Sequence, residues 1–390
     1  MLLTETAPIV PRQRQVFRRV WVATFLCFAA FYGITQPLAE VLGRSAFDVG
    51  ATSAVLGAFG VTALLARPLA GWLSDRLAPR WILGLGAVAL AVGVLGMIWE
   101  TGVEGLILLR GLQALGYAAF TTAGTAWVAR LGESEQRAGR LARFGMAANA
   151  AMAVVPALIG SILLSVSSTG VLLGLGGIAL AAGLCAQITA PMDGSAPGNG
   201  SIARRDHLDA VVRGVGLRPW LLALLIGLGF GVFLQYAPLL ATGDGKGLFT
   251  VYGVTILLTR AVGGRGLDRR ALAAVARLAG GALAVGMMGL WAGGLAGWLG
   301  AAAIGVGGGM LHPAVLAAAV KRVPAAPGLA TGWCYVGFDL GLALSGWALG
   351  PVFGSGGTGL VFALTGVVML GAVWLGGGRD DRDSVIAEGC

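Results

Sequence analysis

A charged pattern of ten residues occurs twice in this sequence, each time at the end of a long apolar run. The copies, RPLAGWLSDR and RAVGGRGLDR, begin at residues 67 and 260, which are 193 positions apart. Four positions agree: Arg67, Gly71, Asp75 and Arg76 in the first copy, and Arg260, Gly264, Asp268 and Arg269 in the second. At a membrane boundary, an aspartate can pair with an arginine or accept hydrogen bonds from a neighbouring helix N-terminus, and glycine permits close backbone approach. The repeat therefore predicts two matching charged contacts on one side of a duplicated membrane protein.

Several ionisable residues lie inside apolar runs rather than between them. They are Arg67, Arg110, Arg260, His312 and Asp339, with Glu40 near one edge of a run. A charge in the interior of a bilayer is expensive unless it is paired or hydrated, so each of these residues is a candidate for function.

Four of these residues are candidates for proton coupling. Asp339 is the only carboxylate in the middle of a predicted span, and it could carry a proton or pair with Arg67 or a backbone group. Arg110 could assist proton transfer, bind an anionic group, or donate hydrogen bonds to nearby carbonyls. His312 could titrate near neutral pH or simply pack. Glu40 could take up protons or be an interfacial acid.

Polar and aromatic side chains within three of the predicted spans could line a substrate cavity. These candidates are Tyr32, Gln36, Gln113, Tyr117, Thr121, Phe230, Phe233 and Gln235. Gln113, Tyr117 and Thr121 are spaced four residues apart, so on a helix they share one face. A mainly aromatic chamber with few charges would suit amphiphilic organic compounds.

The composition indicates a membrane protein with many spans. Of the 390 residues, 57% are hydrophobic and only 12% are charged, whereas soluble domains carry about 25% charged residues. The net charge of +9 is concentrated in alternate breaks between the apolar runs. This asymmetry is typical of membrane topology and argues against nucleic-acid binding. The four cysteines have no metal-ligand spacing and no phosphate-binding loop motif is present, so we expect no metal and no cofactor.

The apolar runs predict twelve transmembrane helices, with both termini in the cytoplasm. The expected spans are 17–41, 49–72, 81–99, 104–129, 141–165, 169–190, 219–241, 249–264, 271–291, 296–319, 327–350 and 357–376. A linker at 191–218, which begins with glycine, proline and serine, separates an N-terminal six-helix bundle (1–190) from a C-terminal one (219–390). The 193-residue offset maps the second and third spans onto the eighth and ninth, so we expect the bundles to be related by a pseudo-two-fold axis.

The first copy of the repeat resembles the loop signature of the major facilitator superfamily, G-x-L-x-D-R-x-G-R-R/K. Residues 71–80, GWLSDRLAPR, match it through Gly71, Leu73, Asp75, Arg76 and Arg80, with Pro79 in place of the second glycine. LILLRGLQALG is similar to the family's R-x-x-Q-G element, with alanine in place of its glycine. The segments FTVYGVTILLTRAVGGRGLDR and GVGGGMLHPAV…GFDLGLALSG resemble the bacterial drug, sugar and metallophore efflux branch.

This resemblance implies that the charged pattern acts as a conformational gate. By analogy with the family, Asp75 would contact the start of the eleventh span near Gly328 and pair with Arg130. The 193-residue offset places Arg322 next to the position equivalent to Arg130, so Asp268 and Arg322 would form a second, mirror-image contact. Such charge pairs exist in one conformation and break in the other.

The resulting functional expectation is a secondary transporter, not an enzyme, that acts in the cytoplasmic membrane. We expect it to export a small organic molecule by proton-coupled alternating access, as a monomer. The alternative is uptake of a sugar or other small metabolite by proton symport or facilitated diffusion. An intramembrane enzyme would need a catalytic cluster, which the sequence does not contain, and a scaffold would leave the intramembrane charges unexplained.

Overall fold

The computed structural model describes residues 11–44, 49–99, 102–189, 204–237, 245–268 and 270–377, and all regular elements within these ranges are helical. The first part of the chain forms α1 (Pro11–Gly33), α2 (Thr35–Arg44), α3 (Val49–Arg76), α4 (Pro79–Leu95), η1 (Gly96–Ile98), α5 (Val103–Ala119), η2 (Phe120–Gly124), α6 (Thr125–Ala129), η3 (Ser134–Gln136), α7 (Arg137–Ile162) and α8 (Ser168–Gln187). The second part forms α9 (Arg204–Val215), α10 (Leu217–Tyr236), α11 (Gly245–Asp268), α12 (Leu272–Ala292), α13 (Gly294–Arg322), α14 (Pro327–Trp347) and α15 (Gly350–Gly377).

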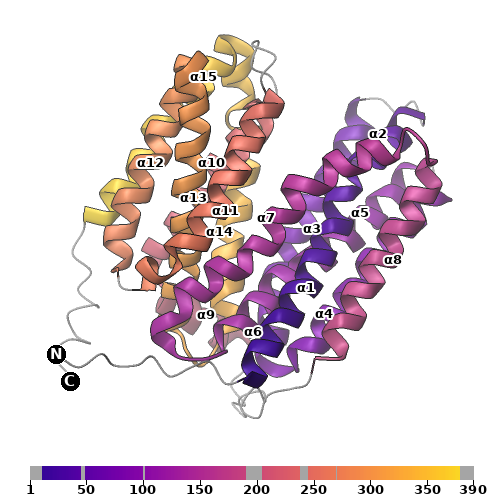
Figure 1. Ribbon diagram of the computed structural model, residues 1–390, viewed down its shortest axis with the longest axis horizontal. Helices are drawn as coiled ribbons and strands as arrows, with labels where there is room; N and C mark the ends of the chain where they lie inside the picture. Colours follow the sequence, from indigo (N-terminus) through magenta and orange to yellow (C-terminus); the bar gives the residue numbers. More distant parts are fainter. Residues whose placement is uncertain are drawn as a thin grey trace.

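The helices gather in two groups, which Figure 1 shows side by side. Helices α1 to α8 form one group and helices α10 to α15 the other. The groups contact each other mainly through α3 with α14 and α7 with α11, and α7 with α13 and α6 with α14 add further contacts. They approach closely at the end that carries α6 and α9, which we call the latch end, and diverge toward the opposite end, which carries α2. The ribbons of the two groups therefore lie farther apart at the α2 end than at the latch end.

The outer surface of the helices is apolar. Leu65 is 72% exposed, Val262 is 82% exposed and Trp374 is 78% exposed, and apolar side chains exposed at such density would be unfavourable in water. Within the described ranges, nine helices are long and apolar enough to cross a bilayer, and a shorter apolar helix covers Gly247–Gly263. The chain is an all-helical membrane protein.

The nine helices do not include α7 and α14, although the sequence predicts spans at both. Both helices contact the opposite group, and both carry polar residues, among them Asn149 in α7 and Asp339 in α14. Both helices therefore lie at the interface between the groups, and their polar residues lie where the two groups meet.

The first and fourth predicted spans are interrupted. The first divides into α1 and α2 between Gly33 and Thr35, because Pro37 has no backbone N–H to continue the helical hydrogen bonds. In the fourth, residues Phe120–Gly124 form a π-helical turn, which inserts one residue into the helix. This turn allows the neighbouring hydroxyls of Thr121 and Thr122 to reach the same cation, Arg67.

The linker contains a helix that the sequence did not lead us to expect. The sequence predicts a linker at 191–218, and residues 190–203 lie outside the described ranges. The remainder forms α9, which buries Val211 and Val215 and packs at the latch end against α13 and α14. Gly216 follows α9 with a φ of 74°, a left-handed conformation that glycine adopts without strain, and it turns the chain into α10.

Candidate functional site

Asp75 joins the two helix groups at the latch end. Its Oδ1 accepts a hydrogen bond from the Gly328 N–H (2.8 Å), and its Oδ2 accepts one from the Leu329 N–H (2.9 Å). These two N–H groups belong to the first turn of α14, so they have no acceptor within the helix itself. The N-cap residue of α14, Ala326, provides no side-chain acceptor either. A carboxylate from α3 thus caps a helix of the other group, where the helix dipole favours a negative charge.

Arg130 completes this contact from the end of α6. Its Nη2 lies 2.6 Å from Asp75 Oδ1, and both of its terminal nitrogens donate to the Ser74 carbonyl at 3.1 Å. Burial lowers the pKa of the Arg130 guanidinium below its ordinary value, and the Asp75 carboxylate opposes that shift, so Arg130 remains a cation. We call Asp75, Arg130 and the N-terminus of α14 the latch.

The latch requires close approach of two backbones. A Cβ added to Gly71 of α3 would lie 2.6 Å from the carbonyl oxygen of Gly328 in α14, closer than real side-chain contacts allow. Any side chain at Gly71 would therefore push α3 and α14 apart. Next to the latch, the guanidinium of Arg76 stacks on the Trp72 ring at 4.3 Å.

The second copy of the pattern is only partly described. The side chain of Asp268, the surroundings of Gly264 and all of Arg269 lie outside the described residues. Arg322 donates from Nη1 to the Val215 carbonyl at 2.9 Å, which ties α13 to the end of α9. The mirror-image contact between Asp268 and Arg322 stays a prediction.

A buried ion pair joins the same two helices nearer the middle of the molecule. Arg67 of α3, which is fully buried, donates from Nε to Asp339 Oδ2 (2.8 Å) and from Nη2 to Asp339 Oδ1 (3.2 Å). Its Nη1 donates to Thr121, and its guanidinium lies 4.4 Å from the centre of the Tyr335 ring. Of the alternatives for Asp339, the structure contains the pairing with Arg67.

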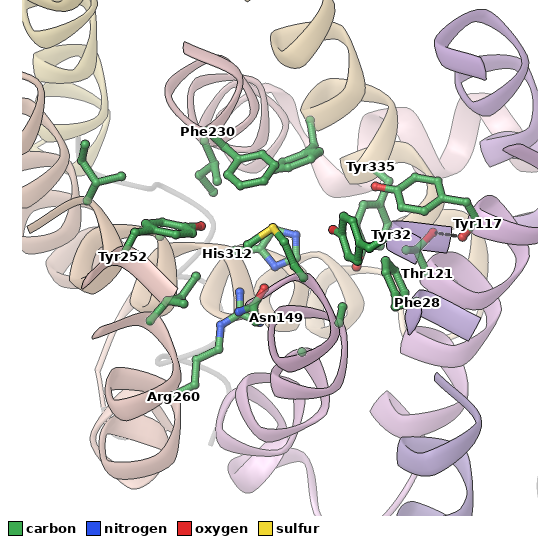
Figure 2. Close-up of a pocket in the computed structure, with 18 of the residues that line it drawn as sticks. Phe28, Tyr32, Tyr117, Thr121, Asn149, Phe230, Tyr252, Arg260, His312 and Tyr335 are labelled. Carbon is green, nitrogen blue, oxygen red and sulfur yellow. Dashed lines mark hydrogen bonds between the residues drawn. The ribbon is translucent and has the colours of Figure 1, made fainter. Parts of the chain in front are cut away.

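A cavity lies between the two groups at the level of this ion pair (Figure 2). Its volume is about 120 Å³, whereas a single water needs roughly 10–15 Å³. Aromatic rings dominate its wall: Phe28, Tyr32, Tyr117, Phe230, Tyr252, Tyr335 and Phe338. Both groups contribute to the wall, so a solute bound here would contact both.

Two hydrogen-bond donors in the cavity wall have no partner among the described residues. Arg260 of α11 is 5% exposed, yet no hydrogen bond or ion pair joins its guanidinium to a described residue, and its buried Nε is unsatisfied. The buried Nδ2 of Asn149, on α7, is also unsatisfied. Figure 2 shows Arg260, Asn149 and His312 in the same part of the cavity wall. Among the described residues, the cavity therefore contains an unpaired cation and an unpaired amide.

The predicted cavity residues divide into two sets. Tyr32, Tyr117, Thr121 and Phe230 line the cavity, and so does His312. The others are not among its lining residues, and each has another contact, as follows. The Gln36 amide donates to Pro156 O, the Gln113 amide donates to Gly93 O, Phe233 packs on Phe249 and Tyr252, and the Gln235 amide donates to Ser345 Oγ.

Gln113 shows why a spacing of four residues did not identify the residues that line the cavity. Residues four apart drift around a helix of 3.6 residues per turn, and Gln113 turns toward α4 while Thr121 lies on the displaced π-helical turn. Arg110 contacts Gln113 rather than the cavity. Its Nη1 donates to Gln113 Oε1 at 2.6 Å, and its guanidinium lies over the Phe59 ring. Glu40 accepts a hydrogen bond from Ser168 at the α2 end.

The sequence did not single out Asn149, Tyr252 or Tyr335 as wall residues. A signal existed for Asn149, because an asparagine one turn after Gly145 is unusual within an apolar run. Arg260 was identified as an intramembrane charge, and it occupies the position equivalent to Arg67 in the repeat. The two equivalent arginines have different surroundings, since Arg67 is paired and Arg260 has no partner among the described residues.

The sequence model of the Major Facilitator Superfamily matches residues 20–345. The chain belongs to this superfamily. Its members are transporters rather than enzymes, which agrees with the expectation that this chain is not an enzyme. The resemblance inferred from residues 71–80 is thus confirmed at the level of the superfamily.

Solved structures share the fold across nearly the whole chain. A variant of the E. coli fucose:proton symporter FucP superposes with a TM-score of 0.72 at 17% identity, covering 93% of this chain and 98% of that one. The human organic anion transporter MFSD10 gives 0.72 at 19% identity, covering 94% and 100%. At these identities the likeness concerns the fold alone.

A curated sequence relative matches only locally. The Mycobacterium tuberculosis protein named Probable nitrate/nitrite transporter NarK2 is 36% identical over 84 residues, which are 19% of this chain and 20% of that protein. The match therefore spans about a fifth of the length of the relative.

Proposed function

We propose that this protein is a secondary transporter that moves a small molecule across the cytoplasmic membrane by alternating access. The observation that carries the proposal is the combination of a latch at one end with a cavity between the groups, which diverge toward the other end. Breaking the latch would let the groups separate at the latch end, which would expose the same cavity to the opposite side. The protein acts as a monomer in the lipid bilayer.

The distribution of charge supports the orientation of this cycle. Basic residues gather at the latch end: Arg14, Arg18, Arg19, Arg76, Arg80, Arg130, Arg137, Arg140, Arg213, Arg218, Lys321 and Arg322. Glu40 and Glu104 lie toward the other end. By the positive-inside rule the latch end faces the cytoplasm, together with both chain termini. The twelve predicted spans then form two six-helix bundles, 1–190 and 219–390, joined by the linker 191–218.

Protonation of Asp339 is the proposed coupling step. Asp339 and Arg67 hold α3 of one group to α14 of the other. A proton on Asp339 would remove the charge attraction of this pair, and so would favour separation of the two helices. The other coupling candidates have less direct links: His312 lines the cavity, whereas Arg110 contacts Gln113 and Glu40 contacts Ser168.

For the direction of transport we propose export of a small organic molecule in exchange for protons. Support comes from the resemblance of the eighth, tenth and eleventh spans to the bacterial efflux branch and from the aromatic cavity wall. The second candidate is uptake by symport or facilitated diffusion. The local similarity to NarK2 favours that candidate for one kind of solute, nitrate or nitrite.

Proteoliposomes with an imposed proton gradient test coupling and direction together. The expected result is gradient-driven movement of solute out of the compartment equivalent to the cytoplasm, which Asp75→Asn slows strongly and Asp339→Asn makes independent of the gradient. Wild-type rates in Asp75→Asn would contradict the latch as part of the cycle. Unchanged gradient dependence in Asp339→Asn would exclude Asp339 as the proton site. Asp209→Asn, an exposed acid on α9, is the matched control.

A further inference from the structure

We propose that the cavity holds one planar monovalent oxyanion, a carboxylate or nitrate-like group, between Arg260 and Asn149, and that the Arg67–Asp339 pair restricts the site to a single negative charge. This inference rests on the proposed transport function and names the substrate class of the same cavity. Its support comes from unsatisfied groups, close packing and a count of charges.

The unsatisfied groups in the wall are donors. Arg260 Nε and Asn149 Nδ2 are buried and have no acceptor among the described residues, and leaving such groups unpaired is unfavourable. A guanidinium presents its N–H groups in a planar fork that fits a planar oxyanion. An acceptor-rich, negatively charged ligand would satisfy both donors at once, whereas a cation would be repelled by Arg260.

The packing indicates that Arg260 is positioned to bind across the interface. Arg260 belongs to α11, but its guanidinium lies against α7, where a Cβ added to Gly145 would be 3.1 Å from Arg260 Cζ and closer still to Nη1. Glycine at this position leaves room for the guanidinium beside Asn149, one turn further along α7 (Figure 2). An anion held by both residues would therefore be bound by both helix groups.

The count of charges limits the ligand to a monoanion. Arg67 and Asp339 form a bidentate ion pair behind the Tyr117 and Tyr335 rings of the wall, and together they contribute no net charge. Arg260 remains as the single uncompensated cation among the described wall residues. One negative charge balances it, and a second would lie unpaired in a low-dielectric site. Asp339→Asn would free Arg67 and give the site two cations.

Thermal stability of the purified full-length protein in detergent at neutral pH measures binding, because a ligand that prefers the folded state raises its melting temperature. The probes are sodium benzoate and sodium nitrate, with benzamide as the neutral match of benzoate and phthalate as its divalent match. We expect benzoate or nitrate to stabilise the wild type, benzamide to have no effect, and Arg260→Gln to weaken anion binding at least about tenfold. Arg277→Gln, at an exposed arginine of α12, should bind as the wild type does.

Two further variants keep the test decisive if Arg260→Gln is poorly folded. Gly145→Ala retains the charge but displaces the guanidinium, so it should also weaken anion binding, whereas Gly177→Ala, which has open space around it, should not. Asp339→Asn should shift the preference between phthalate and benzoate toward phthalate by at least about tenfold. The proposal is overturned if neither anion stabilises the wild type, if benzamide binds as well as benzoate, or if Arg260→Gln and Gly145→Ala bind anions normally. This test is independent of the test of transport. Wild-type transport in Asp75→Asn would contradict the transport proposal even if anion binding were normal, and loss of anion binding would not affect the argument from Asp75.

Discussion

The ion pair between Arg67 and Asp339 allows a quantitative prediction about the stability of the interface. Both residues are nearly inaccessible, with side-chain exposures of 0% and 8%, and two N–O contacts of 2.8 and 3.2 Å join them. Removal of one partner of a buried pair leaves the other charge uncompensated, which costs about 3–5 kcal/mol. We therefore expect Asp339→Asn to lower the free energy of unfolding by about this amount.

The two single substitutions should not be equal. In Arg67→Gln the remaining carboxyl of Asp339 can take a proton and become neutral, whereas in Asp339→Asn the guanidinium of Arg67 cannot lose its charge. The loss in Arg67→Gln should therefore be smaller than in Asp339→Asn. The double substitution removes both charges, so it should be more stable than the sum of the single losses predicts, by about 2–4 kcal/mol.

Unfolding of the four proteins in mixed detergent micelles by added SDS measures this cycle. The expected signature is strong non-additivity with Asp339→Asn as the least stable variant. Additivity to within about 0.5 kcal/mol, which is usual for independent sites, would refute the argument that the pair acts as a unit across the interface.

Two other substitutions test the latch through its packing and its geometry. Gly71→Ala would force two backbones apart, because the new Cβ would lie 2.6 Å from Gly328 O. We therefore expect the free energy of unfolding to fall by about 1–3 kcal/mol. The control is Gly57→Ala, which has open space around it and should be neutral. Arg130→Lys keeps the positive charge but loses the planar guanidinium that contacts both Asp75 and the Ser74 carbonyl. A cysteine introduced between the groups at the latch end should therefore react faster with a thiol label. An unchanged labelling rate would show that a point charge suffices.

Much of the latch could be predicted from the sequence, because the signature fixes residue types at short spacing. Gly71 and Asp75 are one turn apart on a helix, and the family resemblance supplied the partner positions, Gly328 and Arg130. The structure contains these contacts, although their role in a conformational cycle is still a prediction.

The cavity was harder to predict, because its wall depends on how the helices rotate about their axes. Tyr117 and Thr121 line it, but Gln113, one turn earlier, turns toward α4. No spacing rule anticipates the π-helical turn at Phe120–Gly124, which changes which side chains face inward. Nor does sequence alone reveal which of two equivalent arginines is paired. That difference, Arg67 with Asp339 and Arg260 without a partner among the described residues, follows from the contacts between distant helices.

The central claim is that the latch holds one of two alternating conformations, and paired distance measurements test it most directly. Spin labels at Leu77 and Lys321 would report on the latch end, and labels at Leu164 and Leu295 on the α2 end, all in a background without the native cysteines. Leu164 and Leu295 are exposed by 87% and 76%. In Asp75→Asn the account predicts that the latch-end distance lengthens while the α2-end distance shortens. Unchanged distances, or lengthening at the latch end without shortening at the α2 end, would contradict alternating access controlled by the latch.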